Sequence, residues 1–236
     1  PPLRQDQNYR VLVMTLGDMT LLEAFARHKH VDLGLTDVRI APGTSCIISA
    51  PAHCLKTELL YHIAITVAAK ASSVKTGVLW LDADGKFNVR RFSEICQTRH
   101  QRSWTTILDK VSVARVRSAS EAAQTLHGLD PAQLIIIIDG TDSWVHLACK
   151  PSCSRLRQIL SEVCRGGAIL LITISDSAGL HGHSPWRNCS PVSMTMTIAQ
   201  QLITSSFTVT VHGAGISCKR SLSLSCDDFG VSVLPS

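Results

Sequence analysis

Leu134-Ile135-Ile136-Ile137-Ile138-Asp139 is the stretch that decides the fold, because five apolar residues run without interruption into one carboxylate. A strand that is apolar on both faces belongs in the middle of a parallel sheet that helices cover. Three further runs also lack an in/out alternation, at residues 46–49, 77–81 and 168–174. A weaker run at 111–116 does alternate, so we expect it nearer the edge of the same sheet.

Helices and a second kind of strand fill the rest of the chain. The expected helices lie between the apolar runs, at residues 57–69, 89–97, 119–126 and 154–164. Toward the C-terminus the pattern changes to alternating strands, at residues 207–211, 221–225 and 231–234. We therefore predict an α/β fold: a mainly parallel central sheet, flanked by helices and closed by a C-terminal antiparallel meander.

The composition excludes two classes of protein. The chain has 236 residues, 45% hydrophobic and 17% charged, so it can bury a sizeable core as one globular domain and is not disordered. Its longest apolar run, 134–138, is far shorter than the roughly 20 residues of a membrane-spanning helix, so we expect no membrane contact. The net charge of +5 permits a nucleic-acid partner without requiring one. The nine scattered cysteines, an odd number, indicate reduced intracellular thiols.

A phosphate-binding loop is the first candidate site. It reads Ala50-Pro51-Ala52-His53-Cys54-Leu55-Lys56-Thr57, and these residues are the candidate nucleotide-binding set. In a G-x-x-x-x-G-K-[ST] loop, glycines let backbone N–H groups wrap the phosphates, Lys neutralises them and Ser or Thr holds Mg²⁺. Lys56 and Thr57 are present, but Ala50 and Leu55 replace both glycines. A leucine in a left-handed conformation costs roughly 1–2 kcal/mol, and we expect its side chain to crowd the anion.

Asp139 is the second candidate, because the isoleucine run delivers it to the carboxyl end of a buried strand. Ligands of open α/β sheets bind at that edge, where a P-loop protein carries the carboxylate that orients Mg²⁺. The alternative is that Asp139 only caps the following turn, Gly140-Thr141-Asp142, as aspartate often does. When Asp139 is considered together with Lys56 and Thr57, the metal site is favoured over the turn cap. Thr57 and Asp139 are then the candidate Mg²⁺ ligands.

Four stretches carry a resemblance to the RecA superfamily, at residues 40–63, 78–92, 133–144 with 168–176, and 206–233. The first is similar to the family's phosphate loop, and the second resembles a segment that reads Y-I-D-T-E-G-x-F-x-x-x-R-[LI] in active recombinases. Within the first, Thr57-Glu58-Leu59-Leu60-Tyr61-His62 is especially similar to the short eukaryotic Rad-fifty-one recombinase paralogues that lack an N-terminal domain.

The resemblance implies two parts of the chain. Residues 40–236 would form a RecA-type P-loop core of the ATPase type. Residues 1–39 would form an N-terminal helix, at 20–28, and a linker. This helix could pack on the core of the chain itself. The resemblance offers an alternative, in which the helix and the Arg90-Arg91 face contact a partner.

Departures from the family pattern argue against an efficient enzyme. Asp84 stands where active members carry the glutamate that activates the attacking water, and it is one methylene shorter. Ser175 and Asp176 replace an Asn-Gln pair that senses the γ-phosphate. The resemblance therefore implies a degenerate site, in which ATP and Mg²⁺ are a structural clamp or are not required, and ATPase activity is weak or absent.

Contact with single-stranded DNA is the family's other activity, carried by two loops, here 145–151 and 177–193. Lys150, Trp186 and Arg187 are the candidate DNA-binding residues, because tryptophan stacks on bases and the cations contact phosphates. The alternative is an ordinary surface loop, which contains such residues by chance.

The resemblance implies a role in homologous recombination DNA repair in the nucleus. With another recombinase paralogue or a small adaptor protein, the chain would bind recombinase filaments on single-stranded DNA and remodel or stabilise them. One rival is an active DNA-stimulated P-loop ATPase, whose phosphate release Asp139→Ala would abolish. Another is a small-molecule P-loop kinase, which needs an Arg-rich lid that is not apparent in the sequence.

Overall fold

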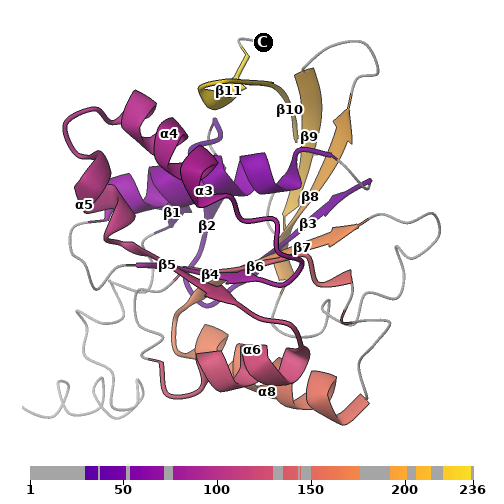
Figure 1. Cartoon of the computed structure of the whole chain (residues 1–236). Helices are drawn as coiled ribbons and strands as arrows, with labels where there is room; N and C mark the ends of the chain where they lie inside the picture. Colours follow the sequence, from indigo (N-terminus) through magenta and orange to yellow (C-terminus); the bar gives the residue numbers. More distant parts are fainter. Residues whose placement is uncertain are drawn as a thin grey trace, which may run out of the picture.

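The predicted α/β class is confirmed by the computed structural model. It describes residues 30–36, 38–51, 54–71, 77–129, 135–142, 144, 150–175, 192–200, 206–213 and 220–234. Within these residues a nine-stranded sheet of order β11-β10-β9-β8-β3-β7-β6-β4-β5 lies between two layers of helices (Figure 1).

The elements follow the expected succession along the chain. The strands of the sheet are β3 (Ser45–Ala50), β4 (Val78–Asp82), β5 (Val111–Arg115), β6 (Ile135–Asp139), β7 (Ile169–Ser175), β8 (Val192–Gln200), β9 (Ser206–Gly213), β10 (Arg220–Asp227) and β11 (Gly230–Val233). The helices are α3 (Lys56–Lys70), α4 (Val89–Arg99), α5 (Trp104–Leu108), α6 (Ala119–Leu126) and α8 (Lys150–Arg165). Strands β3 to β8 are parallel, and β9 to β11 continue the sheet as the predicted antiparallel meander.

The isoleucine run of β6 is buried on both sides because the sheet has a core on each face. Ile135 and Ile137 belong to the core under α3, α4 and α5, whereas Ile136 and Ile138 belong to the core under α6 and α8. Figure 1 shows these helices as two layers on opposite faces of the sheet. None of the four isoleucines is more than 5% exposed, so a polar residue has no place on either face of the strand.

The sequence analysis missed strand β8 and several short elements. Met194, Met196 and Ile198 of β8 are buried and alternate with more exposed threonines, which is a pattern that predicts a strand. β8 pairs in parallel with β3 and antiparallel with β9, so it is the strand at which the sheet changes direction. Helix α5 and the antiparallel pair β1 (Val31–Asp32) and β2 (Arg39–Ile40) are too short to give a periodic signal.

Other expectations are corrected or lie outside the described residues. The loop expected at 145–151 ends earlier, because α8 begins at Lys150, and the loop expected at 177–193 ends where β8 begins at Val192. The helix expected at 20–28 lies outside the described residues. Six cysteines lie within the described part of the chain, and four of them, Cys46, Cys96, Cys153 and Cys164, are buried. No described helix combines the length and the apolar character that crossing a membrane requires.

Candidate nucleotide site

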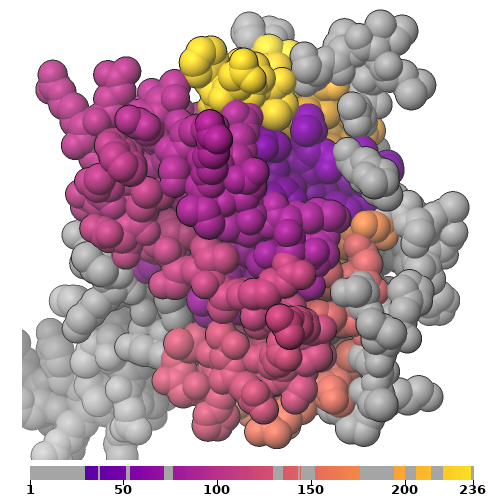
Figure 2. Space-filling model, in the orientation of Figure 1, coloured from indigo at the N-terminus to yellow at the C-terminus, as the bar shows by residue number. Residues whose placement is uncertain are grey.

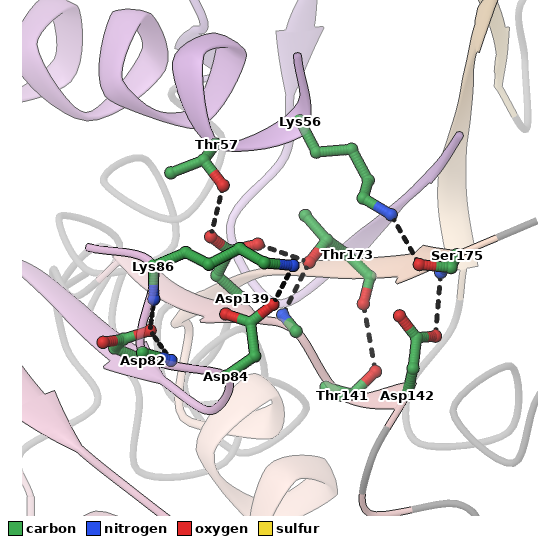
Figure 3. Close-up of polar contacts among 12 residues, drawn as sticks. Lys56, Thr57, Asp82, Asp84, Lys86, Asp139, Thr141, Asp142, Thr173 and Ser175 are labelled. Atoms are coloured by element: carbon green, nitrogen blue, oxygen red, sulfur yellow. Dashed lines mark hydrogen bonds and ion pairs between the residues drawn. The ribbon is translucent and has the colours of Figure 1, made fainter. Parts of the chain in front are cut away.

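Residues from four neighbouring elements meet at the carboxyl edge of the parallel strands (Figure 3). Asp139 ends β6, and both of its carboxylate oxygens accept a hydrogen bond. Thr57 Oγ1 donates to Oδ2 at 2.9 Å, and Thr173 Oγ1 of β7 donates to Oδ1 at 2.7 Å. Burial raises the pKa of Asp139, although the two hydroxyl hydrogen bonds act in the opposite direction. The structure thus brings together Thr57 and Asp139, the two residues that the sequence analysis chose as metal ligands.

Lys56, the first residue of α3, extends across the same edge. Its ammonium donates to Ser175 Oγ at 2.8 Å and to the carbonyl oxygens of Ala50 and Ile174, both at 3.4 Å. Burial lowers the pKa of Lys56, while the negative charges of Asp142 and Asp139 oppose that shift. Ser175, at the predicted sensor position, therefore contacts the lysine directly, and Asp142 Oδ1 accepts from its backbone N–H at 2.8 Å.

The expectation of backbone strain at Leu55 is wrong. Leu55 has a φ of −66°, which lies outside the left-handed region, and its side chain packs against the core under α3. The turn closes by hydrogen bonds from Cys54 N to Pro51 O at 3.3 Å and from Lys56 N to Cys54 O at 2.7 Å. Ala50 is fully buried at the end of β3, and Pro51 is exposed. Of the candidate loop, Ala52 and His53 lie outside the described residues.

Asp84 lies at the same edge, but its carboxylate already has a partner. Lys86 Nζ is 2.5 Å from Asp84 Oδ2, and this hydrogen bond raises the pKa of Lys86. The Asp84 carboxyl rests on Gly140, where an added Cβ would lie 2.4 Å from Asp84 Cγ and where φ is +86°. Only glycine fits that position. The sequence analysis missed Lys86, although a cation two residues after Asp84 is visible in the sequence.

Thr173 and Thr141 are further site residues that the sequence analysis did not single out. Thr173 Oγ1 accepts from Gly140 N at 2.9 Å while it donates to Asp139, and Thr141 Oγ1 donates to Thr173 O at 3.0 Å. Both threonines are fully buried. The available signal was one hydroxyl residue within the apolar run at 168–174. These bonds hold the Asp139 carboxylate in one orientation.

Two arginines of α4 connect helix α3, which carries Lys56 and Thr57, to the C-terminal hairpin formed by β10 and β11. Arg91 contacts both carboxylate oxygens of Glu58 at 3.2 Å and donates to the carbonyl oxygens of residues 227 and 228 at 2.7 and 2.6 Å. Figure 2 shows the yellow end of the chain packed against this part of the molecule. Arg91 is therefore engaged within the chain, whereas Arg90 of the proposed partner face is exposed and pairs with Glu94.

Arg99 makes the second tie through a buried histidine. It donates to the carbonyl oxygens of Phe229, at 2.9 Å, and Val231, and its NH1 group lies 2.7 Å from His62 Nδ1. A guanidinium can only donate, so His62 Nδ1 must accept and the proton of the neutral ring sits on Nε2, which donates to Gly34 O at 2.9 Å. Burial, with a smaller effect of the Arg99 charge, lowers the pKa of His62.

This arrangement predicts a loss of stability in mild acid. Because the pKa of His62 is lower in the folded chain than the ordinary 6.5, the unfolded chain takes up the proton first as pH falls below about 6.5. Between pH 7.5 and 5.5, we expect the wild type to lose about 1 kcal/mol more free energy of unfolding than His62→Gln, measured by urea denaturation. Equal losses in the two proteins would show that His62 is not the titrating group.

Lys150 is the first residue of α8, and Trp186 and Arg187 lie outside the described residues. No group of three or more His, Cys, Asp or Glu side chains that could hold a metal ion occurs in the described part of the chain.

The order of the strands in the sheet and the two layers of helices match a RecA-type fold. Among solved structures, the chain is similar to the crystal structure of the RadB recombinase, with a TM-score of 0.65 and 12% sequence identity. The alignment covers 84% of this chain and 93% of that chain. At such low identity the likeness establishes the fold alone. No protein-family model and no curated protein match the sequence.

Proposed function

We propose that the chain is a recombinase paralogue of homologous recombination repair, which binds a nucleotide as a structural ligand and hydrolyses it slowly or not at all. The observation that carries the proposal is the contrast at one edge of the sheet. Lys56, Thr57 and Asp139 lie together as a phosphate and metal site requires, whereas Asp84, the base that the sequence analysis chose, is held by Lys86.

The chemistry of these side chains suits a nucleotide. The ammonium of Lys56 is a phosphate ligand, and the oxygens of Thr57 and Asp139, 2.9 Å apart, are the hard donors that Mg²⁺ prefers. Thr57 and Asp139 would hold that ion, which when bound neutralises phosphate charge. Lys56 is already directed at this edge by Ser175, so little reorganisation is needed when phosphate replaces the protein acceptors.

Slow hydrolysis follows from the position of Asp84. Its side chain is shorter than glutamate, rests on Gly140 and forms an ion pair at 2.5 Å. A general base must reach the attacking water, and one oxygen of the Asp84 carboxylate is occupied by the Lys86 ammonium. The chain's residues therefore favour a bound nucleotide over its turnover.

The proposal includes partners that the family resemblance suggests. The resemblance of the sequence to recombinase paralogues is the ground for proposing action on recombinase filaments in the nucleus, together with a recombinase paralogue or small adaptor protein that contacts residues 1–39. Lys150, Trp186 and Arg187 are the proposed contacts with single-stranded DNA.

The experiment compares the wild type with Asp84→Asn, each co-purified with its cellular partner and added to fluorescent recombinase filaments on single-stranded DNA. We expect both proteins to change the rate of filament dissociation equally, because the effect needs binding and not hydrolysis. Loss of the effect in Asp84→Asn, together with loss of DNA-stimulated phosphate release, would instead support the active ATPase. No change of the rate with either protein would refute the filament role.

A further inference from the structure

The backbone of Lys86 is held by the turn that carries it. Asp82 Oδ1 accepts from the backbone N–H groups of Gly85 at 2.8 Å and Lys86 at 3.1 Å. Asp82 Oδ2 pairs with Arg115 at 3.1 Å, and the guanidinium of Arg115 fills the space beside Gly85. The Lys86 side chain therefore leaves the turn from a defined backbone position, and Figure 3 shows its ammonium directed toward Asp84 and the Asp139 side of the site.

The Lys86 ammonium lies near two carboxylates, those of Asp84 and Asp139 (Figure 3). Asp82 and Asp139 are register partners at the ends of β4 and β6, and Ala83 N donates to Asp139 O at 2.9 Å. Asp84 follows directly, and its carboxyl rests on Gly140, the residue after Asp139. Neighbouring carboxylates repel each other unless a cation lies between them. In metal-dependent sites a divalent ion supplies that charge, and here the chain places a lysine 2.5 Å from one of the carboxylates.

We propose that Lys86 is a built-in cation that takes over the charge of the divalent metal ion beside Asp84 and Asp139. Metal binding is thereby weakened, and a nucleotide bound at Lys56 depends little on Mg²⁺. The nucleotide part rests on the proposed function, whereas the competition between Lys86 and a metal concerns the chain alone. Lys86 acts as a positioning residue: its partner Asp84 is kept neutralised and away from water activation.

The test uses Mn²⁺ alone as the probe, because Mn²⁺ prefers the same oxygen ligands as Mg²⁺ and its free form is counted by electron paramagnetic resonance. We expect Lys86→Met to bind Mn²⁺ about tenfold more tightly than the wild type, since it removes one positive charge beside two carboxylates. Lys86→Arg, which keeps the charge, should behave as the wild type. The control Lys70→Met removes an equal charge from an exposed pair with Asp32 and should leave Mn²⁺ binding unchanged.

Two results would overturn the role of Lys86: equal Mn²⁺ affinity in the wild type and Lys86→Met, or an equal gain in Lys70→Met. Lys86 is 67% exposed, so its replacement should not prevent folding, and a thermal melt of each variant verifies this. A second titration measures ADP binding in EDTA. If neither the wild type nor Lys86→Met binds ADP but Lys86→Met binds Mn²⁺ more tightly, the proposed nucleotide function is refuted and the role of Lys86 as a built-in cation is supported. If both bind ADP and Mn²⁺ affinity is equal, only the built-in cation fails.

Discussion

Trp80→Ala is expected to destabilise the chain by about 3–5 kcal/mol, a large part of the stability of an ordinary domain. Trp80 of β4 is fully buried, and its ring centroid lies 5.3 Å from that of Tyr61 and 5.0 Å from that of Phe87. Tyr61 belongs to α3 and accepts a hydrogen bond from Asn88 N at 2.7 Å through its hydroxyl. The indole therefore packs between the helix that carries Lys56 and the segment that carries Asp84 and Lys86.

The matched control is Trp80→Phe, measured by urea unfolding under the same conditions. The indole N–H is buried and has no hydrogen-bond acceptor among the described residues, so its removal leaves no partner unsatisfied. A phenyl ring keeps most of the aromatic contact, and we expect a loss below about 1.5 kcal/mol. If the two substitutions destabilise the chain equally, the aromatic contact that a phenyl ring keeps does not account for the loss.

Lys56→Ala is expected to weaken ADP binding by about one to two orders of magnitude, because hydrogen bonds to charged groups contribute about 1.5–3 kcal/mol. Lys56 is buried beside its three protein acceptors, so the ammonium is held near the phosphate position before a nucleotide arrives. Titration with a fluorescent ADP analogue at fixed ionic strength measures the change.

Lys70→Ala is the control for this substitution. Lys70 ends the same helix, but its side chain is 55% exposed and pairs with Asp32 at the surface. Its removal changes the net charge by the same amount, and we expect ADP affinity within about twofold of the wild type, since distant surface charges are screened. If Lys56→Ala bound ADP with unchanged affinity, Lys56 would not be a phosphate ligand.

Much of the fold follows from patterns that local physics makes unambiguous. The isoleucine run of β6 and the apolar runs of β3, β4 and β7 predict a doubly covered parallel sheet, because nothing else buries both faces of a strand. The same run places Asp139 at the ligand edge, and the order of elements places Lys56 and Thr57 opposite it. Strand β8 was also predictable, since Met194, Met196 and Ile198 alternate.

The rest depends on contacts that spacing does not encode. The side chain of Lys86 pairs with Asp84 from a turn whose backbone Asp82 holds, and the sequence offers no periodicity that would predict such a turn. The ordinary φ of Leu55 depends on how the loop closes and not on which residue replaces a glycine. The ties from Arg91 and Arg99 to the C-terminal hairpin join residues more than 100 positions apart.

The most direct test of the central claim is to follow ATP bound to the purified chain and its partner while single-stranded DNA is added. Quenched samples are separated to measure intact ATP, ADP and phosphate. The residues at the edge predict that ATP binds and is recovered intact, because Lys56 and Thr57 are in place while Asp84 is paired with Lys86. Formation of ADP and phosphate that single-stranded DNA stimulates and Asp139→Ala abolishes would contradict the claim.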